Sequence, residues 1–128
     1  MAGISKMLLT WVLSVITYNC QFLNNRERAQ DIASSLDATV SGIQSAGLKL
    51  KARDDKKYTQ RTVGDYHTID FRTDCKGYAN KCCGCTLMTK LQPKTLLKVF
   101  APDADIVGRV GAARYKCHSY DLCPMVLY

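Results

Sequence analysis

The sequence lacks the short motifs that identify most catalytic sites. It contains no G-x-S-x-G nucleophile elbow, no P-loop, no H-E-x-x-H zinc motif and no dinucleotide-binding G-x-G-x-x-G. Only two histidines are present, and Ser119 is the single serine after Ser45. The C-terminal part of the chain therefore offers few serine and histidine residues for catalysis, and we predict that the protein is not an enzyme.

The chain also lacks internal repeats, low-complexity tracts and an excess of acidic residues. Its 128 residues include 18 lysines and arginines against 11 aspartates and glutamates, which gives a formal net charge of +7. A basic balance favours polyanions or anionic membrane surfaces as partners. Because the basic residues are spread along the chain and interleaved with acidic ones, we expect nucleic acid to be the less favoured partner.

What is present is a seven-residue hydrophobic repeat in the first 50 residues. Two apolar series, three positions apart, occupy the a and d positions of a heptad, which is typical of a helix with one apolar stripe. The pattern predicts a long helix over residues 1–50, hydrophobic over 4–23 and amphipathic over 26–50. The residues predicted to join subunits are Leu8, Trp11, Val15, Tyr18, Phe22, Ile32, Leu36, Ile43 and Leu50.

An unbroken helix of this kind would be roughly 70 Å long at about 1.5 Å per residue, which is more than a small domain can cover. We therefore predict that the stripe binds other copies of the chain and that the protein is a homo-oligomer. For residues 4–23, a membrane anchor and packing within the assembly remain equally open. A cleaved signal peptide is a weaker alternative, because Thr17 and Asn19 would stand where small residues are preferred.

The hydrophobic period changes from 3.5 to 2 after a polar segment, residues 51–62, which we interpret as a charged linker. Alternation predicts strands at 65–71, 95–101 and 106–110, with short edge strands at 115–117 and 125–128. The predicted fold class is α+β, with a long N-terminal helix followed by a small cysteine-stapled antiparallel β domain at 63–128.

Six of the seven cysteines fall in that predicted β domain. An even number of cysteines in a small domain favours a disulfide framework and an exported or membrane-associated protein at a cell or virion surface. The cysteines predicted to form disulfides are Cys75, Cys82, Cys83, Cys85, Cys117 and Cys123.

Zinc is the alternative chemistry for the same region. Cys82 and Cys85 form a C-x₂-C pair with Gly84 between them, and Cys117 could complete the site with either His118 or Cys123. A zinc site would place the protein in the cytoplasm or nucleus, and no other cofactor is expected. Cys20 is the odd seventh cysteine, and its role is left open.

These observations lead to two functional hypotheses. The preferred one is a non-enzymatic structural protein that assembles through its N-terminal helix as a filament, a pilus-like fibre, or a virion or membrane-surface component. The alternative is an intracellular basic zinc protein that oligomerises and binds nucleic acid.

Overall fold

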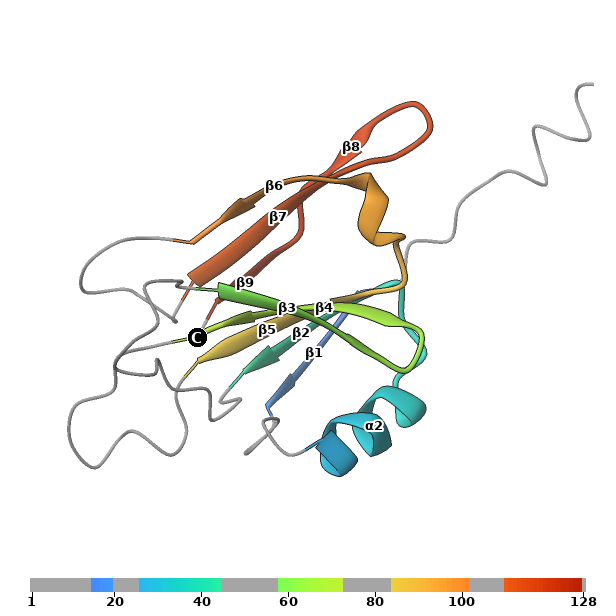
Figure 1. Ribbon diagram of the computed structural model, residues 1–128, viewed down its shortest axis with the longest axis vertical. Helices are drawn as coiled ribbons and strands as arrows, with labels where there is room; N and C mark the ends of the chain where they lie inside the picture. The colour runs from blue at the N-terminus through green and yellow to red at the C-terminus, as the bar shows by residue number, and fades with distance from the viewer. Residues whose placement is uncertain (1–14, 20–25, 45–57, 73–83, 102–109, 128) are drawn as a thin grey trace, which may run out of the picture.

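The described part of the protein folds as two stacked β-sheets, with the short α-helix α2 on the outside (Figure 1). The computed structural model describes residues 15–19, 26–44, 58–72, 84–101 and 110–127. The elements of the first sheet and its helix are β1 (Val15–Asn19), α2 (Arg26–Ser35), β2 (Val40–Gln44), β3 (Tyr58–Val63), β4 (Tyr66–Phe71) and β5 (Cys85–Thr89). Those of the second sheet are the 3₁₀-helix η2 (Pro93–Thr95), β6 (Leu96–Phe100), β7 (Val110–Lys116), β8 (Asp121–Leu122) and β9 (Met125–Leu127).

The five-stranded sheet has the order β1-β2-β5-β4-β3. Strands β1 and β2 are parallel, and α2 lies between them in sequence as the crossover that a parallel pair requires. The remaining neighbours pair antiparallel. Strands β3 and β4 are joined by the two-residue turn Gly64-Asp65, in which Gly64 has a φ of 57° that suits a tight hairpin.

Helix α2 packs on the face of this sheet that points away from the second sheet. Its inward side carries Ala29, Ile32 and Ala33, and the two alanines allow the helix to approach the sheet closely. Together with the sheet they form the first core cluster: Ala29, Ile32, Ala33, Ile43, Val63, Tyr66 and Met88.

The four-stranded sheet is built around β7, which pairs with β6, β8 and β9. Its inner face and the five-stranded sheet enclose the second core cluster: Val40, Ile69, Phe71, Cys85, Leu87, Ala113, Tyr115 and Val126. The sheets approach closely at Gly111, where an added Cβ would lie 2.2 Å from Cδ2 of Phe71. The outer face of the four-stranded sheet carries no helix among the described elements.

The prediction of a long N-terminal helix is wrong. Within the described ranges α2 is the one α-helix, and it spans only residues 26–35 of the predicted 50. Residues 15–19 and 40–44 of the same predicted helix are β-strands instead. The physical reason is clear for β2. The first four residues of β2 are buried, on both faces of the sheet, so they are small or apolar and do not alternate with exposed polar residues. Ile43 also follows Leu36 by seven residues, which imitates part of a heptad.

The fold class is therefore mainly antiparallel β, and the predicted α+β class is wrong. The predicted strands at 65–71, 95–101 and 125–128 correspond to β4, β6 and β9. Strand β3 runs through the second half of the predicted linker, and strands from both sides of that linker lie in one sheet. None of the helices in the described part of the chain has the length and apolar character needed to cross a bilayer.

The predicted disulfide framework is also wrong for every cysteine that the structure describes. Cys85, Cys117 and Cys123 are free thiols. Cys85 belongs to the core between the sheets, where burial raises the pKa of its thiol to about 12 and keeps it protonated. Cys85, which the sequence predicted to form a disulfide, instead contributes to hydrophobic packing between the sheets.

Candidate functional site

Strand β7 organises the exposed face of the four-stranded sheet. Three alternate residues, Gly111, Ala113 and Tyr115, are buried toward the five-stranded sheet. Their neighbours lie on the outer face, in the order Val110, Ala112, Arg114 and Lys116. The outer face therefore changes from apolar to basic along one strand.

Side chains from the two strands that flank β7 project beside its outer face. Strand β6 places Phe100 opposite Ala112 and Lys98 opposite Arg114. Strand β9 places Met125 opposite Ala112 on the other side. Because alanine is small and both neighbours are large, a hollow runs along β7. It has a volume of about 620 Å³, and its lining is Lys98, Val99, Phe100, Ala101, Val110, Ala112, Cys123 and Met125.

Large apolar side chains are exposed around this hollow. Met125 is 61% exposed and Phe100 41%, and Leu127, which pairs with Val110 on the same face, is 56% exposed. A cluster of exposed apolar side chains on one face of a soluble domain is typical of an interaction surface. We call the group Lys98, Phe100, Arg114, Lys116, Met125 and Leu127 the basic–apolar face.

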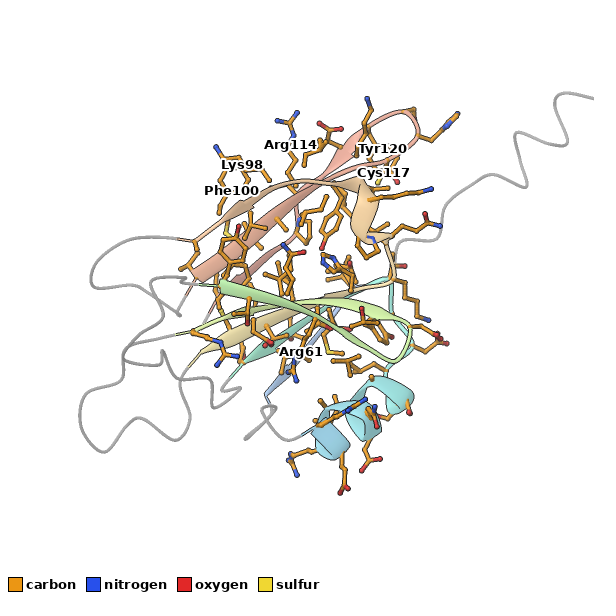
Figure 2. All side chains as sticks on the ribbon, viewed as in Figure 1. Arg61, Lys98, Phe100, Arg114, Cys117 and Tyr120 are labelled. Carbon is orange, nitrogen blue, oxygen red and sulfur yellow. The ribbon has the colours of Figure 1, made fainter. Side chains whose placement is uncertain are left out.

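The charges on this face are mainly positive. Nζ of Lys98 lies 4.9 Å from the centre of the Phe100 ring, within the range of a cation–π interaction. Arg114 donates from Nε to Oδ2 of Asp121 at 2.9 Å. Figure 2 shows Lys98 and Arg114 on the side of the four-stranded sheet that faces away from the five-stranded sheet. Three cations therefore share the face with one carboxylate.

A second hollow lies between the two sheets, beside the edge strand β1. Its volume is about 330 Å³, and Cys123 and Met125 line both this groove and the hollow along β7. Val15 lines it from β1 and is 64% exposed. Nε2 of Gln44 donates to the carbonyl oxygen of Leu127 at 2.8 Å, which ties β2 to β9. The apolar surface thus continues around β9 to the open side of the sandwich.

A buried polar network joins the two sheets through His67. Its Nδ1 lies 2.9 Å from the hydroxyl of Tyr115, and its Nε2 lies 2.9 Å from Oε1 of Gln60. An amide oxygen can only accept, so Nε2 carries the proton and Nδ1 accepts from the Tyr115 hydroxyl. Burial lowers the pKa of His67 and raises that of Tyr115, so both groups are held neutral. The network is satisfied internally, which points to a structural role.

A second buried polar group lies on the helix side of the five-stranded sheet. Nε of Arg61 is 2.7 Å from Oδ2 of Asp70, and the Thr86 hydroxyl donates to Oδ1 of Asp70 at 2.8 Å. These contacts join β3, β4 and β5. Arg61 and Thr86 satisfy the buried Asp70 carboxylate within the sheet, so these contacts also have a structural explanation.

The structure scatters the residues predicted to join subunits. Leu8, Trp11, Phe22 and Leu50 lie outside the described residues, as does the side chain of Tyr18. Of the rest, Ile32 and Ile43 belong to the first core cluster, with half-buried Leu36 packed against it. Val15 is exposed on β1. The described members therefore form no single stripe along one helix.

The predicted cysteine and zinc residues are likewise dispersed. Cys75, Cys82, Cys83 and Cys20 lie outside the described residues. Cys85 is in the inter-sheet core, Cys117 is half-buried, and His118 and Cys123 are exposed. No group of three potential metal ligands occurs among the described residues. The alternative zinc set of Cys82, Cys85, Cys117, His118 and Cys123 is thus not assembled by the part that the structure describes.

The basic–apolar face was missed by reasoning from the sequence. Its signal in the sequence was weak: the outward positions of 110–116 change from apolar (Val110, Ala112) to cationic (Arg114, Lys116). Recognising it required the strand register that places Phe100, Ala112 and Met125 in one row.

No protein-family model matches the sequence, and no curated protein matches it. The functional argument therefore rests on the physical character of the face.

Proposed function

We propose that the protein is a non-enzymatic binding protein that attaches peripherally to anionic membrane surfaces through the basic–apolar face. The single observation that carries this proposal is the row Phe100, Ala112 and Met125, an apolar hollow with exposed walls, directly beside the row Lys98 and Arg114. Apolar side chains next to cations match a bilayer interface, which offers acyl chains next to anionic headgroups.

The energetics favour a partner that satisfies both halves of the face. Each lysine or arginine near an anionic bilayer surface contributes about 1 kcal/mol, and removing apolar surface from water contributes about 25 cal/mol per Å². Phe100, Met125 and Leu127 supply the apolar area, and Lys98 and Lys116 supply charge beside it.

Self-association through this face is disfavoured by charge. Two copies meeting face to face would bring Lys98, Arg114 and Lys116 of one copy near the same residues of the other, and Asp121 is the one neighbouring acid that the described residues supply on each. Like charges placed together oppose association. The net charge of +7 adds to that repulsion.

Nucleic acid would satisfy the cations but not the apolar walls. Its phosphates can contact lysines, and a base can stack on one aromatic ring such as Phe100. The hollow, however, is lined mainly by aliphatic side chains, including Val110, Ala112 and Met125. A lipid interface covers such side chains with hydrocarbon, so we favour it over nucleic acid.

The proposal keeps the membrane-associated location expected from the sequence and gives it a different physical basis. The predicted helical seam is not part of it, because Ile32 and Ile43 are needed in the core. Attachment through the surface of a folded sheet is peripheral and reversible, and its strength depends on salt.

Co-sedimentation with vesicles tests the proposal. We expect the protein to bind phosphatidylcholine vesicles that contain about 30% phosphatidylserine and to bind pure phosphatidylcholine weakly. The double variant Phe100→Ser, Met125→Ser should lose most of the binding while keeping its circular dichroism spectrum, because both side chains are exposed.

Equal sedimentation of the double variant and the wild type would contradict the proposal. Tight binding of a single-stranded oligonucleotide with no binding to either vesicle would replace it with nucleic-acid recognition. A concentration-dependent dimer that the double variant abolishes would replace it with self-association.

A further inference from the structure

A separate cleft lies at the end of the sandwich where β5 and β7 finish. It has a volume of about 370 Å³ and runs between the segment after β5 and the turn after β7. It shares no lining residue with the hollow along β7 or the groove between the sheets. Its polar lining residues are Thr39, Lys90, Gln92, Thr95, Lys116 and His118.

Lys90 supplies the first cation of this cleft. Its Nζ lies 3.1 Å from Oδ1 of Asp37 and 5.7 Å from the centre of the Tyr66 ring. An ammonium group has three donors, and the Asp37 contact uses one of them. The backbone N–H of Lys90 donates to the carbonyl oxygen of Thr39 at 3.0 Å, which fixes this wall of the cleft.

Lys116 and His118 supply nitrogen donors from the opposite wall. Both are exposed, and within the described residues neither makes an ion pair. Asp121 is the register partner of Lys116, but its carboxylate accepts from Arg114. The turn is held by the backbone bond from the Cys117 N–H to the carbonyl oxygen of Tyr120, at 2.8 Å.

The third side of the cleft is a fixed turn. The hydroxyl of Thr95 donates to the carbonyl oxygen of Gln92 at 2.6 Å, and the Thr95 N–H donates to the same oxygen at 2.9 Å. The side-chain amide of Gln92 adds two further donors to the lining. Among the described residues no carboxylate belongs to the lining, and Asp37 contacts the cleft through its pair with Lys90.

We propose that this cleft binds the phosphate group of a phosphomonoester. A phosphomonoester carries a charge of about −1.5 to −2 near pH 7 and presents three acceptor oxygens, so it can accept from several donors at once. Lys90, Lys116 and His118 approach from two walls, which suits a compact dianion better than the single charge of a carboxylate. The inference goes beyond the proposed membrane attachment; Lys116 belongs to both the cleft and the basic–apolar face, whereas Lys90 and His118 belong to the cleft alone.

Calorimetric titration with inorganic phosphate is the first arm of the test. We expect the wild type to bind phosphate at constant ionic strength, and Lys90→Ala, Lys116→Ala and His118→Ala each to weaken binding by about fivefold or more. The matched control is Lys94→Ala, which removes an exposed lysine from the neighbouring η2 that does not line the cleft. Its affinity should stay within about twofold of the wild type.

Vesicles separate a lipid headgroup from a soluble ligand as the source of the phosphate. Phosphatidate presents a phosphomonoester, whereas phosphatidylserine presents a phosphodiester. Preference for phosphatidate at equal surface charge, lost in His118→Ala, would assign the cleft to a lipid headgroup. Binding of inorganic phosphate without that preference would assign it to a soluble phosphomonoester.

Two results would overturn the inference. One is the absence of phosphate binding by the folded wild type, and the other is equal weakening by Lys94→Ala and the cleft variants. Neither outcome affects the membrane proposal, which rests on phosphatidylserine vesicles and on Phe100 and Met125. Conversely, phosphate binding by a protein that ignores both vesicle types would leave the cleft in place and remove the membrane proposal.

Discussion

The two sheets of this protein differ in how many of their faces are covered. The five-stranded sheet is covered by α2 on one side and by the second sheet on the other, and all six residues of β4 are buried. Among the described residues, the four-stranded sheet is covered on its inner face only, and Phe100, Met125 and Leu127 are exposed. We therefore associate stability mainly with the first sheet and, in the function proposed above, recognition with the outer face of the second.

The number of covered faces also determines how well a strand can be recognised from its sequence. A strand covered on both faces has no reason to alternate, so β2 reads as a continuous small and apolar segment. A strand covered on one face tends to alternate, and β7 does so from Ala113 to Lys116. Alternation is therefore a signal of partial exposure as much as of strand structure.

Truncating one side chain in each sheet should give the largest difference in stability between the two sheets. Ile43→Ala in the first core cluster should lower the free energy of unfolding by about 2–5 kcal/mol, because Ile43 is fully buried. Leu127→Ala should change it by less than about 0.5 kcal/mol, because Leu127 is 56% exposed. Urea denaturation measures both, and similar losses would show that the outer face is part of the core.

A smaller effect should follow from substituting glycines where the sheets meet. Gly111→Ala would place a Cβ 2.2 Å from the Phe71 ring, so we expect a loss of about 1–3 kcal/mol in the free energy of unfolding. Gly42→Ala is the matched control, since its nearest contact is Cγ2 of Val126 at 3.2 Å and a small shift relieves it. If Gly42→Ala cost as much as Gly111→Ala, the close approach at Phe71 would not define the sheet spacing.

Part of this fold could be predicted from the sequence. Alternation in 66–71 and 96–100 identified β4 and β6, and the apolar spacing of Ile32 and Leu36 identified a helix. The helix was extended too far because Ile43 continues the seven-residue spacing from Leu36. Low helix propensity at Thr39, Val40 and Gly42 was the local signal that opposed the extension.

The candidate site could not be predicted, for a geometric reason. Phe100, Ala112 and Met125 are separated by 12 and 13 positions in the chain, and only strand pairing places them side by side. Cysteine count was a misleading guide, because Cys85 behaves as a small apolar residue in the core. The heptad spacing and the number of cysteines both favoured other structures. The residues of the basic–apolar face, taken one by one, have no unusual feature in the sequence.

A weaker effect on stability should appear on acidification, through the contact between the sheets at His67. Burial lowers the pKa of His67 below its usual 6.5, so the unfolded chain binds a proton at higher pH than the folded one. Its contribution to stability is therefore complete above pH 6.5 and is lost as the pH falls from there toward the folded-state pKa. Denaturation curves between about pH 7 and pH 5 should show this slope, and His67→Gln should reduce it. An unchanged slope in His67→Gln would assign the acid sensitivity to other groups.

The most direct test of the division between the two sheets removes one positive charge from each side of the molecule. Lys98→Gln alters the basic–apolar face, and Arg26→Gln alters exposed α2 on the opposite side, so both variants have the same net charge. In co-sedimentation with vesicles that contain about 30% phosphatidylserine, Lys98→Gln should weaken binding about fivefold and Arg26→Gln by less than about twofold. Equal weakening by the two variants would mean that net charge alone drives the attachment, and it would contradict a specific membrane-binding face on the four-stranded sheet.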